Sequence, residues 1–310
     1  MPHGAQALLE APDIQEFGVV GRIGVVTVTF NSATVLPDFL ASVESQSYRQ
    51  YRLYAIDNAS SDASVKMLEA NKGIDLVVVR NTENLGVAEG NNQGIRLALE
   101  DGCTHVLLLN NDTVFSPDLF AALMRTADSE HQSMVIPKML YHEPANRIWC
   151  AGGQLVALRG YAPKHFGEGE LDDGGYDEDR IVEYGPTCCM LIESRVFDTV
   201  GLMDPKYFVY NDDVDFCVRA SRRGIGIWYV HSAVLWHKVG SLTGGAESPF
   251  VARMGTRNKV YFLKKNLGLT VALVFCLAYF PYLLQRSVRG QDEWSRFALK
   301  CRSLLEGIRM

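Results

Sequence analysis

Residues 105–113 read HVLLLNNDT, in which an unbroken apolar run is followed directly by polar residues. A run without alternation is typical of a strand buried on both faces, as in a parallel sheet with helices on each side. Asn110, Asn111 and Asp112 would then emerge at the carboxyl end of this strand, the edge at which open α/β sheets bind ligands. A carboxylate there suits a hard divalent cation, which could carry a diphosphate. Taken alone, the polar residues could equally be a turn followed by a helix cap.

Strand-and-helix units precede this strand along the chain. Residues 22–30, 52–56 and 76–79 predict strands, each followed by apolar residues at helical spacing, and another helical pattern follows the central strand. Successive units of this kind favour a right-handed, doubly wound, mostly parallel α/β sheet with helices on both faces. Asp57 and Asp112 thus end two of its strands.

A glycine-containing segment, NLGVAEGNNQG at residues 84–94, opens the helix after the third strand. Glycines let a backbone approach a ligand closely, and helix N-termini favour anions. The segment is weak evidence by itself, because it has neither the GxGxxG order of dinucleotide sites nor the GK[ST] of phosphate loops.

The strand–helix rhythm breaks after Met134. Residues 152–179 are rich in Gly, Asp and Glu and predict a long surface loop or irregular hairpin, a usual place for a lid over an acceptor. The pattern then predicts short elements: a strand through residues 188–191, a helix near 195–200, and strands at 225–230 and 233–235.

A second informative stretch is YFVYNDDVDFCVRA at residues 207–220. Helical spacing starts at Val214, so Asp212, Asp213 and Asp215 crowd the first turn. Acidic residues are favourable at a helix N-terminus, but these carboxylates repel one another and exceed what a cap requires. At least one is therefore a candidate general base, whose pKa the crowding would raise towards a useful range.

The segment WHKVGS at residues 236–241 contains a candidate metal ligand. A lone histidine is more often structural than a ligand. His237, however, lies at the end of a predicted strand in a polar segment that contains glycine, so it could be a further protein ligand for the cation.

The charge of the chain is uneven. Residues 251–310 carry 11 Lys and Arg against 3 Asp and Glu, a net charge of +8, whereas residues 1–250 have a net charge of −14. A basic tail on an acidic body favours an anionic partner for the tail alone. Because the body has no basic face, we expect no nucleic acid as a partner, and a membrane surface fits better.

The tail also contains the most apolar stretch, LGLTVALVFCLAYFPYLL at residues 267–284. It could pack on the rest of the chain, pack on a second copy in a homodimer, or lie in a membrane interface as a peripheral contact through residues 266–284. A full membrane span is the weakest of these alternatives, since Gly268, Thr270 and Pro281 interrupt the stretch.

Compartment is indicated by the cysteines and the N-terminus. The seven cysteines form no CxxC pair and no metal-ligand spacing, which predicts reduced packing residues. Residues 1–21 have no signal-peptide pattern and predict a flexible leader. We therefore expect a cytoplasmic protein, or one that is peripheral on the cytoplasmic face of the membrane.

Segments in the same order resemble the family 2 glycosyltransferases with a GT-A fold, and within them the bacterial rhamnosyltransferase-like branch: VVTVTFN, IDNASSD, NLGVAEGNNQG, LLLNNDT, YFVYNDDVDFCVRA and VLWHKVGS. The resemblance implies a GT-A domain at residues 22–245, with a nucleotide-binding half at 22–130 and an acceptor and catalytic half at 131–245. Residues 246–310 would form a basic, apolar helical extension.

The resemblance also implies roles for matching positions. The donor-binding residues would be Thr29, Asn31, Asp57, Asn84, Gly86, Asn91, Asn110 and Asn111. The metal ligands for Mg2+ or Mn2+ would be Asp112 and His237, with Asn110 standing where the family has the first Asp of its DxD motif. Asp213 would be the catalytic base, and residues that contact the acceptor or support the site would be Asp212, Asp215 and Trp236.

The activity implied is inverting transfer of a sugar, best matched by L-rhamnose from dTDP-rhamnose, to a glycan or lipid-linked glycan in cell-surface polysaccharide synthesis. A UDP-sugar is the alternative donor. Two alternatives come from other classes: a sugar-phosphate nucleotidyltransferase, and a nucleotide-sugar binding module without catalysis. The first predicts a basic, Gly-rich loop after the first strand, where residues 30–34 read FNSAT; the second is disfavoured by Asp112, Asp213 and His237 together.

Overall fold

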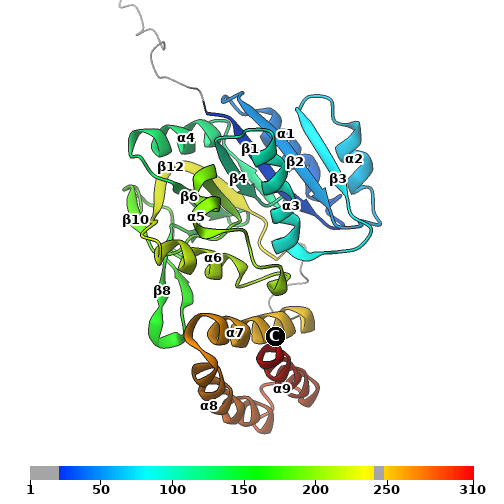
Figure 1. Cartoon of the computed structure of the whole chain (residues 1–310), viewed down its shortest axis with the longest axis vertical. Helices are drawn as coiled ribbons and strands as arrows, with labels where there is room; N and C mark the ends of the chain where they lie inside the picture. Colours follow the sequence, from blue (N-terminus) through cyan, green and yellow to red (C-terminus); the bar gives the residue numbers. More distant parts are fainter. Residues whose placement is uncertain (1–20, 241–247) are drawn as a thin grey trace, which may run out of the picture.

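The computed structural model describes residues 21–240 and 248–310. The predicted leader, apart from residue 21, and Ser241 of the WHKVGS segment lie outside the described residues. The described chain forms one large mixed sheet with helices on both faces, and a layer of three helices lies at one end of the molecule (Figure 1).

The first half of the sheet is parallel, with the strand order β3–β2–β1–β4. These strands are β1 (Ile23–Thr29), β2 (Tyr51–Asp57), β3 (Leu76–Arg80) and β4 (His105–Leu109). The helices between them are α1 (Leu36–Glu44), α2 (Ser64–Ala70) and α3 (Gly86–Glu100). The chain steps outward from β1 to β3 and then returns past β1 to β4, so right-handed crossovers place α1 and α2 on one face and α3 on the other. The predicted doubly wound α/β arrangement is confirmed.

The central strand β4 is buried as its apolar run predicts. Val106, Leu107 and Leu108 are fully shielded from solvent, with β1 on one side and β11 (Cys189–Glu193) on the other. The strand order reverses between β1 and β4, and ligands in open α/β sheets bind at such a reversal, beyond the carboxyl ends of the strands. The residues after Thr29 and Leu109 therefore lie where a ligand is expected to bind.

The second half of the sheet is mixed. Its order from β4 is β11–β6–β12–β10, and β5 and β7 pair with β12 and β6. The new elements are β5 (Thr113–Phe115), α4 (Leu119–Ser129), β6 (Met134–Tyr141), β7 (Ile148–Cys150), β10 (Arg180–Val182), α5 (Ser194–Val200), α6 (Asp212–Ser221) and β12 (Ile227–His237). The two short strands predicted at residues 225–230 and 233–235 are one strand, because β12 continues past a register irregularity between Val230 and Val234.

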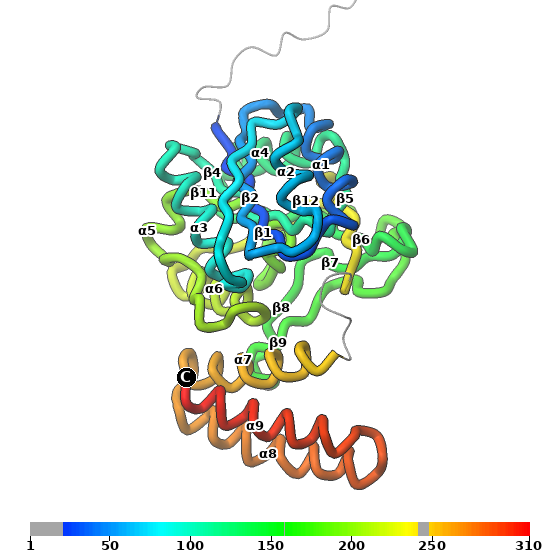
Figure 2. The backbone as a smooth tube through the Cα atoms, turned by 90° about the vertical axis from the view of Figure 1, so that its right-hand side faces the viewer, coloured from blue at the N-terminus to red at the C-terminus, as the bar shows by residue number. Residues whose placement is uncertain are grey.

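The Gly-rich segment 152–179 contains a small hairpin, in line with the sequence. Its strands are β8 (Gly153–Val156) and β9 (Ala162–His165), joined by the short turn η1 (Ala157–Arg159). The hairpin extends from the sheet towards the C-terminal helices (Figure 2). There Lys259 of the C-terminal layer donates a hydrogen bond to the carbonyl of Gly160.

The C-terminal layer consists of α7 (Pro249–Leu267), α8 (Leu269–Val288) and α9 (Trp294–Arg309), which pack on one another. By length and composition, α8 could cross a membrane: its mean hydropathy is 1.5, and 17% of that window is buried. Figure 2 shows α8 and α9 at the end of the molecule farthest from the sheet.

Candidate active site

Asp57 is held rigidly at the carboxyl end of β2. Its Oδ1 accepts a hydrogen bond from Thr29 Oγ1 at 3.0 Å, and its Oδ2 accepts one from the Ser60 amide at 3.0 Å. Both Thr29 and Asp57 are buried. A carboxylate can accept about four hydrogen bonds, so Asp57 keeps acceptor capacity for the N–H of a base or for a ribose hydroxyl.

Asn31 joins the loops that follow β1 and β2. Its backbone has a positive φ of 51°, a conformation that Asn tolerates better than most residues. Its Oδ1 accepts a hydrogen bond from the Ser61 amide at 2.8 Å, and its own amide donates to Ser60 Oγ at 2.9 Å. Thr29, Asn31 and Asp57 are therefore brought together at one edge of the sheet.

Asn111 connects the two strands at the reversal of strand order. Its Nδ2 donates to the carbonyl of Val28 at 2.8 Å, while the backbone amide of Asn110 donates to the carbonyl of Cys188 at 2.9 Å. The segment after β4 is thus tied to β1 on one side and to the start of β11 on the other. The position of Asp112, the next residue, is fixed by these contacts.

Asp112 and His237 are brought together from segments far apart in the sequence. His237 lies opposite Thr113 in the β5–β12 pair, and its Nε2 is 3.3 Å from Asp112 Oδ1. Both side chains are buried. Burial alone would lower the pKa of His237, but Cys188 and Asp112 outweigh it and raise the pKa to about 10. The carboxylate of Asp112 therefore favours a positive charge beside it, either the proton of His237 or a metal cation that takes the place of this proton.

This pair fits part of a metal site. Two neighbouring ligands of an octahedral Mg2+, each about 2.1 Å from the ion, lie about 3 Å apart, close to the 3.3 Å found here. The described residues contain no group of three or more His, Cys, Asp and Glu side chains that could hold a metal. Mg2+ is often bound by one or two protein ligands with phosphates and waters, so this pair would need a diphosphate to complete the shell.

The start of α3 is used differently from the prediction. Asn84 Oδ1 accepts from the Gly86 amide at 2.9 Å, but the next amides, of Val87 and Ala88, donate to the carbonyl of Phe208 at 2.6 and 3.2 Å. These two amides bind protein rather than an anion. Gly86 has a φ of +82°, and a Cβ there would lie 2.5 Å from the same carbonyl oxygen, so this glycine is required by Phe208.

The other glycines of the segment bring α3 close to β1. A Cβ on Gly90 would lie 2.7 Å from Val28, and one on Gly94 would lie 2.3 Å from Val26. Asn91, between them, is buried in the helix. Protein packing therefore explains Gly90 and Gly94, for which the sequence suggested approach to a ligand.

Asp213 occupies the first turn of α6. Its Oδ2 accepts a hydrogen bond from the hydroxyl of Tyr184 at 2.5 Å, and its Oδ1 accepts one from the Val214 amide at 2.7 Å. Burial raises the pKa of Asp213, and the Tyr184 hydrogen bond opposes that rise. Burial and the charge of Asp213 raise the pKa of neighbouring Asp212. A carboxylate with a raised pKa is a stronger base once ionised.

Asp215 and Trp236 are the two other residues expected to contact the acceptor or support the site. Asp215 is fully buried and accepts hydrogen bonds from Arg219, Lys265, Asn266 and Tyr207. It therefore supports the attachment of α6 to α7. Trp236 donates its indole N–H to the carbonyl of Ala145 at 3.1 Å, and strand alternation turns it away from the face that carries His237.

A row of rings links the Asp112–His237 pair to Asp213. Trp149 packs against His237 with ring centroids 4.4 Å apart and against His165 at 5.1 Å. His165 stacks on Tyr184 at 5.7 Å, and Tyr184 donates to Asp213. Sequence reasoning missed Trp149, His165 and Tyr184, because their separation along the chain gives no spacing signal.

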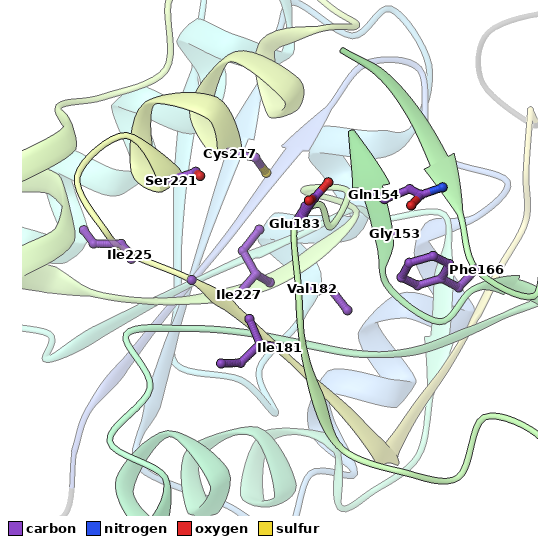
Figure 3. A pocket seen from close by; sticks show the side chains of 11 residues that line it. Gly153, Gln154, Phe166, Ile181, Val182, Glu183, Cys217, Ser221, Ile225 and Ile227 are labelled. Carbon is purple, nitrogen blue, oxygen red and sulfur yellow. The ribbon is translucent and has the colours of Figure 1, made fainter. Parts of the chain in front are cut away.

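The structure also has a pocket beside α6, with a volume of about 300 Å³ (Figure 3). It lies one helical turn beyond Asp213, since Cys217 lines it together with Val182, Glu183 and Ile227. None of the residues predicted for the donor, the metal or the base lines this pocket. The geometry therefore distinguishes it from the candidate site at the sheet edge.

Comparisons with known proteins identify a family for part of the chain. Residues 24–174 match the model of Glycosyl transferase family 2. The hexosyltransferase Agl10 of low-salt glycan biosynthesis in Haloferax volcanii is 28% identical over 56% of this chain, which spans 54% of that relative. The dTDP-rhamnosyl transferase RfbF of Shigella flexneri is 21% identical over 79% of this chain and 81% of its own.

Two further similarities concern the whole domain. The N-acetylglucosaminyl-diphospho-decaprenol L-rhamnosyltransferase of Mycobacterium tuberculosis is 23% identical over 79% of this chain and 85% of its own. The structure of mannosyltransferase PcManGT from Pyrobaculum calidifontis, in complex with GDP-Man and Mn2+, matches with a TM-score of 0.56 and 14% identity over 98% of this chain and 89% of its own. Residues 24–174 therefore form a domain that matches glycosyl transferase family 2, the chain is similar to bacterial rhamnosyltransferases, and it has the GT-A fold.

Proposed function

We propose that the protein is an inverting, metal-dependent glycosyltransferase that moves L-rhamnose from dTDP-rhamnose to a hydroxyl of a glycan or lipid-linked glycan in cell-surface polysaccharide synthesis. One observation carries the proposal: a row of rings connects the Asp112–His237 pair, which suits a diphosphate-bound cation, to Asp213, which suits a base. The Asp112–His237 pair would then act on the leaving diphosphate at one end of this row, and Asp213 would act on the acceptor hydroxyl at the other end.

The donor assignment rests on relatives and on the nucleotide edge. Two relatives are named as rhamnosyltransferases, one of them as a dTDP-rhamnosyl transferase. Thr29, Asn31 and Asp57 would hold the base and ribose, and Asn110 and Asn111 would line the diphosphate and sugar. Asn84, Gly86 and Asn91 would support this side of the site through α3, whose start is held by the carbonyl of Phe208. A UDP-sugar is the alternative donor for the same fold and mechanism.

The metal would be held by Asp112 and His237, with Mg2+ or Mn2+ both compatible with this oxygen and nitrogen donor set. When bound, such a cation neutralises charge that develops on the departing nucleoside diphosphate. Asn110 adds no charge where a second Asp would stand, so the site depends on Asp112 for its protein carboxylate.

Asp213 would act on the acceptor. Its carboxylate takes the proton of the acceptor hydroxyl while that oxygen bonds to the anomeric carbon and the bond from this carbon to the diphosphate breaks. A single base on the face opposite the leaving group gives inversion. Tyr184 keeps the carboxylate oriented, and burial keeps the pKa of Tyr184 high so that the phenol remains a donor.

A donor screen tests the assignment. The purified protein with Mn2+ should be stabilised against heat by dTDP-rhamnose, and Asp57→Ala should abolish the stabilisation because it removes the acceptor carboxylate beside Thr29. The measurement is a thermal shift over dTDP-, UDP- and GDP-sugars, with slow release of nucleoside diphosphate as a second readout. Stabilisation by UDP-sugars alone would contradict rhamnose, and no stabilisation by any donor would contradict the whole proposal.

We also propose that α8 contacts the cytoplasmic face of a membrane. Large apolar side chains are exposed along this helix: Leu269, Val271, Leu273, Val274, Leu277, Phe280, Tyr282, Leu284 and Val288. The C-terminal 60 residues carry a net charge of +8, which favours anionic lipids. Because α8 lies at the outer end of the molecule (Figure 2), a bilayer could cover this face without covering the sheet edge.

Vesicle binding tests this contact. Leu277→Glu, at a position with 75% of its surface exposed, should weaken sedimentation with phosphatidylglycerol vesicles by about tenfold or more, because burying a Leu is worth about 1.5–3 kcal/mol. Ile181→Glu is the matched control, since Ile181 is 65% exposed on the catalytic body. The alternative outcome is a wild-type protein that does not bind the vesicles and elutes as a dimer, with Leu277→Glu eluting as a monomer. That result would assign this face to a second copy of the chain instead.

A further inference from the structure

The loop that leads into α6 has an unfavourable backbone. Phe208, Tyr210 and Asn211 have φ values of 66°, 67° and 64°, between the short helix η2 (Pro205–Tyr207) and Asp212. Residues with a Cβ rarely adopt this left-handed region, and they persist there only where the surroundings impose it. The loop therefore needs external contacts to keep its conformation.

Asn258 of α7 supplies most of those contacts. Its Nδ2 lies within hydrogen-bond distance of three loop carbonyls, those of Tyr207 at 2.9 Å, Val209 at 2.7 Å and Tyr210 at 2.9 Å. Asn258 is completely buried. A buried amide has no water to replace these partners, so its contacts specify the path of the backbone.

Arg257 strengthens the same contact. Its Nη2 donates to the carbonyls of Lys206 at 3.0 Å and Tyr207 at 2.7 Å, and its Nε donates to Asn258 Oδ1 at 2.8 Å. The last bond orients the Asn258 amide with its nitrogen towards the loop. Arg257 and Asn258 thus contact four backbone carbonyls of the loop. These belong to Lys206, Tyr207, Val209 and Tyr210.

The loop in turn joins the two halves of the candidate site. The carbonyl of Phe208 accepts from the amides of Val87 and Ala88 at the start of α3, and Asn211 directly precedes Asp212 and Asp213. The donor-side helix and the base are therefore connected through the 207–211 loop, in which three residues have a positive φ. A shift of this loop would change the position of both.

We propose that Arg257 and Asn258 are positioning residues for sugar transfer, which hold the 207–211 loop so that Asp213 and the start of α3 keep their relative placement. The proposal rests on the proposed function for its kinetic consequence. It also makes α7 part of the catalytic unit, although the sequence assigns residues 246–310 to an extension outside the domain.

The first test measures the loop directly and needs no substrate. In hydrogen–deuterium exchange of the full chain, a peptide that contains residues 86–92 should exchange at least tenfold faster in Asn258→Leu than in the wild type, because the Phe208 carbonyl no longer stays on the amides of Val87 and Ala88. Arg253→Gln is the matched control on the same helix: it removes the ion pair of Arg253 with Glu306 of α9 and should leave this peptide unchanged.

The second test separates positioning from folding. With the donor identified by the screen, Asn258→Leu and Arg257→Met should lower kcat by about 100-fold, the size expected from a displacement of about 1 Å, with KM for the donor changed less than threefold. Arg257→Lys should recover part of the loss, because it restores a donor to the loop carbonyls, and Arg253→Gln should match the wild type. If Asn258→Leu does not fold, the comparison of kcat between Arg257→Met and Arg257→Lys decides whether these residues position the loop.

The outcomes distinguish the two proposals. Unchanged exchange and unchanged kcat in folded variants would overturn the positioning role. A wild-type protein that turns over no nucleotide sugar would overturn the proposed function, and the exchange measurement would still decide whether Arg257 and Asn258 hold the loop.

Discussion

Asp213→Asn is expected to lower kcat for sugar transfer by about 10²- to 10⁴-fold, the usual contribution of a general base. The substitution keeps the size of the side chain but removes the negative charge and one acceptor oxygen, so the side chain can no longer take a proton. Donor stabilisation in the thermal shift should remain, because Asp213 lies on α6 and not at the Thr29–Asp57 edge. The measurement is a single-turnover rate with bound donor and saturating acceptor.

Tyr184→Phe is the matched control, because it removes the 2.5 Å hydrogen bond to Asp213 Oδ2 and leaves the carboxylate. That hydrogen bond lowers the pKa of Asp213, so its loss should raise the pKa. Since the base acts when ionised, the acid limb of the kcat/KM profile should move to higher pH, with activity retained above it. A nucleotide-sugar binding module would be indifferent to both variants, and unchanged turnover in Asp213→Asn would assign the base elsewhere.

Local patterns predicted the parallel half of the fold well. The apolar run before Asn110 predicts a strand that is buried on both faces, and β4 is buried in this way. The carboxyl-end rule then places Asp57 and Asp112 at one edge. These inferences succeed because strand burial and strand–helix alternation depend on residues that are close together in the sequence.

The contacts that complete the candidate site depend on distant segments. Asp112 and His237 meet through the pairing of β5 with β12, and Tyr184 reaches Asp213 from the segment between β10 and β11. Gly86 illustrates the same limit: its motif suggested approach to a ligand, and its neighbour is the carbonyl of Phe208, more than 100 residues away. One sequence carries the residue types but not the partners that tertiary packing selects.

Removal of divalent cations is expected to reduce sugar transfer by about 100-fold or more, and Mg2+ or Mn2+ should restore it. Charge stabilisation of a leaving diphosphate is worth several kcal/mol, and each 1.36 kcal/mol is tenfold in rate. Asp112→Asn should act in the same direction: it should raise the metal concentration needed for half-maximal rate and lower the maximum. The neutral Asn110 cannot compensate, and His237 alone would remain of the pair.

The measurement is the transfer rate of EDTA-treated, desalted protein over a metal titration, for wild type, Asp112→Asn and His237→Gln. Asp198→Asn, an exposed carboxylate on α5, is the control for a general loss of negative charge and should behave as the wild type. His237→Gln replaces the imidazole by an amide, which could still act as a neutral metal ligand. It should therefore raise the metal concentration needed for half-maximal rate less than Asp112→Asn does. Full activity of the metal-free enzyme, unaffected by either substitution, would show that the buried Asp112–His237 pair serves the fold and that the diphosphate is stabilised by other groups.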